Sequence, residues 1–259
     1  MHGAKRALLR VCLFCMLGVI TAGTAPAAGI DFLVPGVSLE SVSFNPGVRV
    51  RYLVTSEVEG AVDSSEVELA VLECGAGGVL IEISSISNPG TPEDILTVRM
   101  RLDRRVTSIS SADEFKECIR SIQVREGTDP FREPSEEEIA DFEFERMFLK
   151  REENAVRRDI GTERIETAAG AFVCDVIELS RRDRRAVKLG GIDAERVEEE
   201  VSTVWLSDEV PFWGMVGSRV ERRRETRLLS NSPAVKLVPH RTVTASMLVY
   251  YERGKAPDR

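Results

Sequence analysis

Two stretches of the chain decide the predicted fold: IETAAGAFVC at Ile165–Cys174, and VWLSDEVPFWGMV at Val204–Val216. The first is typical of two strands joined by a turn of small residues. The second is typical of a strand, an apolar corner broken by Pro211 and Gly214, and another strand. Both patterns predict antiparallel β-structure. Neither contains a nucleophile beside a base, a metal-ligand cluster or a phosphate-binding loop, so the sequence indicates fold and location rather than a specific activity.

The N-terminus predicts a secretory signal peptide over residues 1–28. A basic segment containing Lys5, Arg6 and Arg10 precedes an apolar run from Val11 to Ala22, and small residues follow at 25–28. This order predicts cleavage after Ala27 or Ala28 and a periplasmic or secreted product.

Two other interpretations of this segment are disfavoured. A membrane anchor needs roughly 20 apolar residues, and Gly23, Thr24 and Pro26 end this run early. Lipidation needs small residues directly before a cysteine, and neither Cys12 nor Cys15 has them.

Cleavage would leave 231 of the 259 residues, and loss of three basic residues would move the formal charge from −8 to −11. This acidic balance argues against nucleic acid and anionic membrane surfaces as partners. No internal repeat or low-complexity linker is present, so residues 29–259 are predicted to form a single domain.

The mature chain alternates apolar and polar residues over many short runs separated by Gly, Pro and Asn. This spacing predicts an antiparallel meander. The expected strands are residues 48–58, 67–73, 79–86, 95–102, 172–179, 197–206, 215–229 and 242–251, and extended chain is expected to resume at Arg164 after the helices.

Two helices are predicted within this β-rich chain. Residues 111–122 begin with a capping box at Ser111, and residues 135–152 begin with acidic side chains at the positive end of the helix dipole. Apolar residues form a stripe on each helix, with Phe115, Cys118, Ile119 and Ile122 on the first and Ala140, Phe144, Met147 and Phe148 on the second. Packing of the helices on the sheet is the favoured interpretation. A lid over an apolar cavity is the alternative.

A basic run at Arg181–Arg185 contrasts with the acidic run Glu198–Glu200. The favoured interpretation is a solvated loop between strands. The alternatives are pairing of the two runs across a hairpin, and a patch for an anionic ligand.

The inventory of reactive residues argues against an enzyme. The predicted mature chain has three cysteines (Cys74, Cys118 and Cys174) and one histidine, His240. No Cys-x-x-Cys pair, Gly-x-Ser-x-Gly motif or nucleotide-binding loop is present, so no metal, cofactor or catalytic residue is predicted. In an oxidising compartment the cysteines allow one disulfide with a spare thiol, or three buried thiols, and the sequence does not choose between them.

The hairpin at 167–174 and the corner at 205–216 resemble a group of uncharacterised bacterial secreted proteins. That group carries an AG-x-F-x-C hairpin before a W-x-S-D-E-V-P corner, and its strand layout is similar to the LolA/LolB class of lipoprotein carriers. The resemblance implies an α+β, mainly β fold: a strongly twisted antiparallel half-barrel with helices covering its concave face around an apolar cavity for acyl chains.

Seven aromatic residues are therefore candidates for contact with an apolar ligand: Phe115, Phe144, Phe148, Phe172, Trp205, Phe212 and Trp213. For the last three, a structural corner that fills the core is favoured over a rim around a cavity mouth, because Pro211 and Gly214 already explain the bend.

Two functions follow from these observations. The leading hypothesis is a non-enzymatic envelope protein that binds lipid or lipoprotein acyl chains in a half-barrel. The alternative is a structural or protein-interaction module with a solid core.

Overall fold

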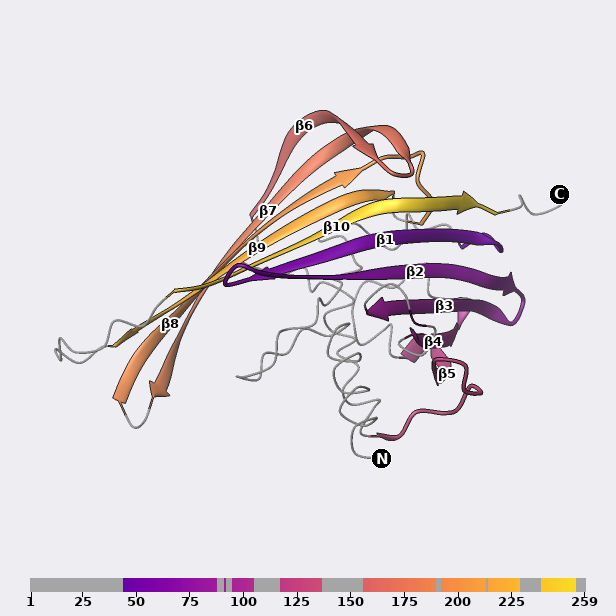
Figure 1. Ribbon diagram of the computed structural model, residues 1–259, viewed down its shortest axis with the longest axis horizontal. Coiled ribbons are helices and arrows are strands. Elements are labelled where there is room, and N and C mark those ends of the chain that lie inside the picture. Colours follow the sequence, from indigo (N-terminus) through magenta and orange to yellow (C-terminus); the bar gives the residue numbers. More distant parts are fainter. Residues whose placement is uncertain are drawn as a thin grey trace.

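The computed structural model describes residues 44–87, 91, 95–104, 117–136, 156–189, 192–212, 214–228 and 239–254. These residues form one antiparallel sheet of ten strands (Figure 1). The strands are β1 (Val48–Val58), β2 (Ala61–Gly75), β3 (Gly78–Ser87), β4 (Ile95–Leu102), β5 (Ile119–Glu126), β6 (Val156–Thr167), β7 (Gly170–Leu189), β8 (Ile192–Leu206), β9 (Met215–Leu228) and β10 (His240–Arg253). The predicted antiparallel sheet is confirmed. The predicted signal peptide, residues 111–116 and residues 137–152 lie outside the described residues.

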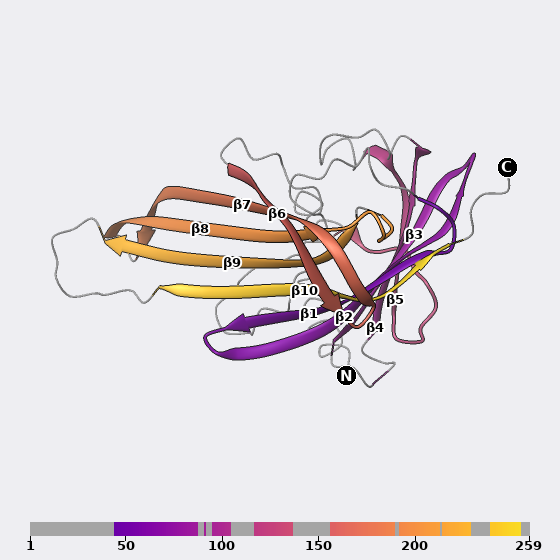
Figure 2. The same ribbon diagram turned by 90° about the horizontal axis from the view of Figure 1, so that it is seen from above.

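The strand order is β5-β4-β3-β2-β1-β10-β9-β8-β7-β6, so two meanders are joined side by side. The first runs outward from β1 to β5, and the second runs inward from β6 to β10. The first and last strands, β1 and β10, pair in the middle with Val48 opposite Arg253. Among the described residues β5 and β6 do not pair with each other, so the sheet is open. The sheet is also strongly twisted (Figure 2).

Short turns set the register of the hairpins. The β6–β7 hairpin closes with Thr167 opposite Gly170, as the small residues between them predict. The β1–β2 hairpin turns at Glu59 and Gly60, whose φ values of 53° and 86° are typical of the primed turns that match strand twist.

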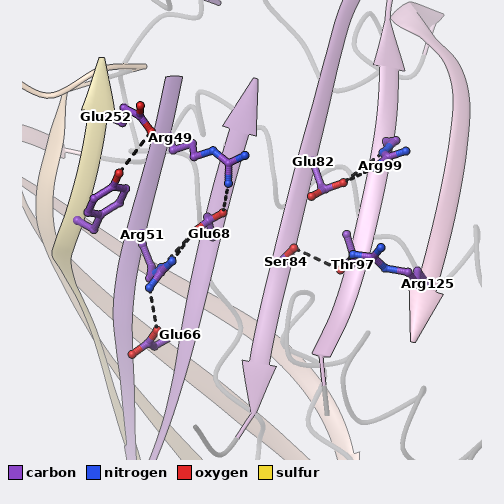
Figure 3. A network of polar contacts seen from close by, with 11 residues as sticks. Arg49, Arg51, Glu66, Glu68, Glu82, Ser84, Thr97, Arg99, Arg125 and Glu252 are labelled. Atoms are coloured by element: carbon purple, nitrogen blue, oxygen red, sulfur yellow. Dashed lines mark hydrogen bonds and ion pairs between the residues drawn. The ribbon is translucent and has the colours of Figure 1, made fainter. Parts of the chain in front are cut away.

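The first meander has one apolar face and one ionic face. Val48, Val50, Tyr52 and Val54 alternate along β1 and are at most 1% exposed, because every second side chain points to the same face. The opposite face carries ion pairs between strands (Figure 3). Glu68 accepts hydrogen bonds from Arg49 and Arg51, and Glu82 accepts them from Arg99.

The β5 edge is covered by the chain that follows it. Val124 and Arg132 exchange backbone hydrogen bonds of 2.8 and 3.0 Å. Beside them the Cζ atoms of Arg99 and Arg125 lie 4.0 and 4.5 Å from the centroid of the Phe131 ring. This arrangement occupies an edge that would otherwise offer free backbone groups.

The prediction of a helix through residue 122 is wrong for its last part. Residues 119–126 form β5, whereas only Glu117 and Cys118 are helical among the described residues of that segment. On β4, Met100 and Leu102 lie two residues apart, but their partners on β5 are Ile122 and Ile119, three apart. A bulge adds one residue to β5 at this point, so two residues of one strand face mimic the spacing of a helix.

The interpretation of Arg181–Arg185 as a solvated loop is also wrong. This run lies inside β7, with Arg181 opposite Glu200, and Arg182 pairs with Glu199 at 3.2 Å. The strands continue because Arg181 and Arg182 lie opposite glutamates of β8, and the long side chains of the run reach solvent at the sheet surface. The hairpin alternative is therefore confirmed.

Candidate apolar site

The β6–β7 hairpin folds toward the C-terminal end of β10. The rings of Phe172 on β7 and Tyr251 on β10 lie 5.8 Å apart between centroids, with planes inclined by 63°. Phe172 and Cys174 are at most 2% exposed, and Ile165 on β6 packs against the same apolar cluster. The second meander is thus rolled, and an apolar cluster fills the inside of the roll.

The corner between β8 and β9 places the ring of Phe212 in this cluster. Phe212 has a φ of 63°, in the left-handed region that bulky residues rarely adopt, and is only 5% exposed. Its ring meets that of Phe44 edge-on, with centroids 6.4 Å apart. A strained conformation of this kind persists where the surrounding structure holds it.

Backbone hydrogen bonds hold the corner in place. The Ser207 N–H donates to the Gly214 carbonyl at 2.8 Å, and the Val210 N–H donates to the Ser207 carbonyl at 3.1 Å. Gly214 has a φ of 76°, and a Cβ at this position would lie 2.9 Å from the Ser207 carbonyl oxygen. The Arg253 guanidinium donates to the Glu209 carbonyl and so ties the corner to the end of β10.

Tyr52 belongs to the same apolar cluster and joins the two meanders. Its side chain is buried, and its hydroxyl donates a hydrogen bond of 3.0 Å to the Met215 carbonyl on β9. Burial raises the pKa of Tyr52 well above its usual range, so the phenol stays a neutral donor. The hydroxyl therefore satisfies a carbonyl at the start of β9.

Trp205 lies at the border between the cluster and solvent. Its indole packs partly buried against the cluster, while its Nε1–H donates to the Glu163 carboxylate on β6 at 2.9 Å. An indole with an apolar body and a bonded, exposed tip is typical of a boundary position.

The structure brings together three of the seven predicted ligand-contact residues, because Phe172, Trp205 and Phe212 all belong to or pack on one cluster. The other four, Phe115, Phe144, Phe148 and Trp213, lie outside the described residues. Sequence reasoning missed Tyr52 and Phe44 as neighbours of these residues. The alternation of β1 places Tyr52 on the face of Val50 and Val54, and this signal was sufficient to find it.

The reactive groups near the cluster lack the arrangement of a nucleophilic site. Burial, followed by the charges of Asp175, Glu163 and Glu209, raises the pKa of Cys174 to about 11, so the group is a thiol rather than a thiolate at neutral pH. His240 begins β10 and so lies at the opposite end of that strand from Tyr251, with its Nδ1 3.1 Å from a Glu59 carboxylate oxygen. No group of three or more potential metal ligands occurs among the residues that the structure describes. Within the same residues no helix is long and apolar enough to span a bilayer.

No protein-family model and no curated protein sequence matches the chain. Several solved structures match over most of their length. A candidate lipoprotein from Parabacteroides distasonis is 14% identical, with a TM-score of 0.33, and the match covers 83% of this chain and 99% of that one. A candidate exported protein with a YmcC-like fold from Bacteroides fragilis is 9% identical, with a TM-score of 0.30 and coverage of 82% and 98%. A LolA superfamily protein from Nitrosomonas europaea is 10% identical, with a TM-score of 0.29 and coverage of 85% and 92%. Likeness at these scores carries no argument about fold or function, and the LolA-like resemblance of the sequence motifs stays a prediction.

Proposed function

We propose that this chain is an exported cell-envelope protein that binds an apolar or lipidated ligand at the rolled end of its sheet, without catalysing a reaction. One observation supports the proposal most directly. In the order of the sheet the apolar cluster runs from β5 to β7, and the buried polar side chains of the described residues are only Ser and Thr. An acyl chain placed against the buried part of this face would meet apolar side chains.

The energy available from such binding is large. Burial of a fourteen-carbon chain contributes on the order of 10 kcal/mol at about 0.8 kcal/mol per methylene, before the cost of association. Trp205 lies at the border of the cluster and gives the site a natural reporter.

A second candidate function is a structural or protein-interaction module with a solid core. The burial of Phe172 and Phe212, at 2% and 5% exposure, favours it, because these rings already fill space at the rolled end. The two candidates differ in whether a ligand enters the cluster.

Fluorescence of Trp205 separates the two. The sequence has two tryptophans, so Trp213→Phe leaves Trp205 as the sole emitter. Titration with a brominated fatty acid is expected to quench Trp205, whereas the same fatty acid without bromine is not. Organic extracts of the protein purified from its own envelope are expected to contain lipid. Absence of both quenching and co-purified lipid would leave the solid-core module as the better account.

A further inference from the structure

The distal parts of β7, β8 and β9 form a charged arm. β6 begins with Val156 opposite Ser180, so residues 181–189 of β7 extend past it and pair only with β8 among the described residues (Figure 1). The chain as a whole is acidic, with a formal charge of −8. The arm differs from it, because β7 and β9 carry runs of arginine here, at 181–185 and 222–224.

Three arginines on one face of this arm surround a single carboxylate. Arg185 and Arg196 are directly opposite each other in the β7–β8 register, and Arg224 is directly opposite Glu198 in the β8–β9 register. Residues 196 and 198 are two apart on β8, so all four share a face. Glu198 is 3.5 Å from Arg185 Nη2 through one carboxylate oxygen and 3.3 Å from Arg224 Nη2 through the other.

Both oxygens of Glu198 are therefore engaged, and Arg196 has no ion pair among the described residues. The Nε atoms of Arg196 and Arg224 are buried without a hydrogen-bond partner. Like charges directly opposite on neighbouring strands are destabilising, and so are buried donors that lack an acceptor. In the adjoining row, Arg222 pairs with Glu200 at 2.6 Å.

The geometry points to an oxyanion site formed by Arg185, Arg196 and Arg224, which binds a phosphate group. Guanidinium groups bind phosphate through paired, charge-assisted hydrogen bonds, and a phosphate would add anionic acceptors to a cluster in which three guanidinium groups share one glutamate. Arg185 is half exposed, with 55% of its side chain accessible, so the cluster is open to solvent. This proposal is independent of the apolar site.

Two carboxylates oppose the ligand: Glu198, which two of the arginines already hold, and Asp183. Asp183 lies opposite Glu198 in the register, is exposed and forms no ion pair among the described residues. Neutralisation of Asp183 should strengthen the binding of an anion, so a variant at this position should have the opposite effect to a variant of the arginines.

Calorimetric titration at fixed ionic strength tests the site with two probes: inorganic phosphate, and a short-chain phosphatidylglycerol below its micellar concentration. Arg196→Gln is expected to weaken the binding of the effective probe by about tenfold or more, as loss of charged hydrogen bonds does. Asp183→Asn is expected to strengthen it. The matched control is Arg219→Gln, which removes an exposed arginine of β9 that lies opposite Thr203 and outside the cluster.

The probes also identify the source of the phosphate. Binding of inorganic phosphate supports a free ligand, and binding of the lipid alone supports a headgroup. If Arg196→Gln does not fold, Arg196→Lys keeps the charge but loses the paired hydrogen bonds, and it should weaken binding as well. The proposal is overturned if neither probe binds, or if Arg219→Gln weakens binding as much as the change at Arg196.

Discussion

Phe172 and Tyr251 are in ring contact although β8 and β9 separate their strands in the sheet order. In a flat sheet, three strand spacings would hold the two backbones about 14 Å apart. Their centroids are 5.8 Å apart, so the second meander must curve strongly at this end. The second meander is therefore rolled at the end where Phe172 and Tyr251 meet.

The Tyr52 hydroxyl is expected to stabilise the junction between the two meanders. Tyr52→Phe removes the donor to the Met215 carbonyl and leaves that carbonyl unsatisfied in a buried place. The free energy of unfolding should fall by about 1–2 kcal/mol in urea denaturation. Tyr250→Phe is the matched control, because its hydroxyl bonds Glu252 at the exposed surface, and its effect should stay below about 0.5 kcal/mol. Equal losses in the two variants would contradict the assigned role.

The corner between β8 and β9 should tolerate no side chain at Gly214. Gly214→Ala places a Cβ against the Ser207 carbonyl and forces a positive φ on alanine, so a loss of about 1–2 kcal/mol or more is expected. Gly77→Ala is the comparison, since a Cβ there meets nothing within 4 Å. Thermal unfolding of both variants measures the difference. A Gly214 variant as stable as the Gly77 variant would show that the corner relaxes freely.

Cys174 should make stability fall at alkaline pH. Its pKa is about 11 in the folded protein and about 8.5 in an unfolded chain, so the unfolded state loses its proton first as the pH rises. The contribution of the thiol is complete below about pH 8.5 and is lost as the pH rises through the folded value. Urea midpoints at pH 7.5 and 10.5 should therefore decrease more for the wild type than for Cys174→Ala. A parallel decrease in both proteins would refute this prediction.

The same thiol should resist alkylation at pH 8. Cys74 is exposed and Cys174 is buried, so iodoacetamide is expected to modify the former alone of these two. Peptide mapping by mass spectrometry identifies the labelled residue. Rapid labelling of Cys174 in native protein would mean that the rolled end opens.

Phe131 is expected to protect the β5 edge. Phe131→Ala removes its contacts with the Arg99 and Arg125 guanidinium groups, each worth about 0.5–1 kcal/mol at an exposed site. Hydrogen exchange at the Val124 amide, which bonds the Arg132 carbonyl, should become faster. Phe131→Trp keeps an aromatic face and should exchange at nearly the wild-type rate. Unchanged exchange in the alanine variant would show that the backbone bonds suffice.

Maturation remains a prediction of the sequence alone. The exported protein should lack residues 1–27 or 1–28 and carry no lipid, because small residues precede each of these cleavage sites. Intact-mass spectrometry of the envelope fraction checks this. Bulky residues at Ala27 and Ala28 together remove the small residue before either cleavage site and should cause the precursor to accumulate. An intact Met1 or an acylated Cys15 in the wild type would contradict the prediction.

Local sequence patterns predicted the sheet well because hairpin turns and strand alternation depend on residues that are neighbours in the sequence. The β6–β7 turn before Gly170 and the corner at Pro211 are examples. Ile119 and Ile122 misled the helix prediction because a bulge depends on the partner strand, and the sequence of β5 alone does not reveal one.

The long-range parts of the fold were harder to predict for the same reason. The central pairing of β1 with β10 joins residues about two hundred positions apart, and no short sequence pattern predicts such a pairing. The contacts within the candidate site were hard to predict for the same reason. Phe172 and Phe212 were found as aromatics within motifs, whereas their contacts with Tyr251 and Phe44 arise only when the sheet rolls.

The placement of β1 and β10 at the centre of the sheet also constrains the order of events during synthesis. When β1 emerges, its partner on one side is β2, only two residues further along, whereas the partner on its other side begins at His240. Until nearly the whole chain has been synthesised, the strand β1 is an open edge, and such an edge readily pairs with other chains. Folding of this protein should therefore depend on a factor that shields β1 until β10 is made, or on synthesis that outpaces edge-to-edge aggregation.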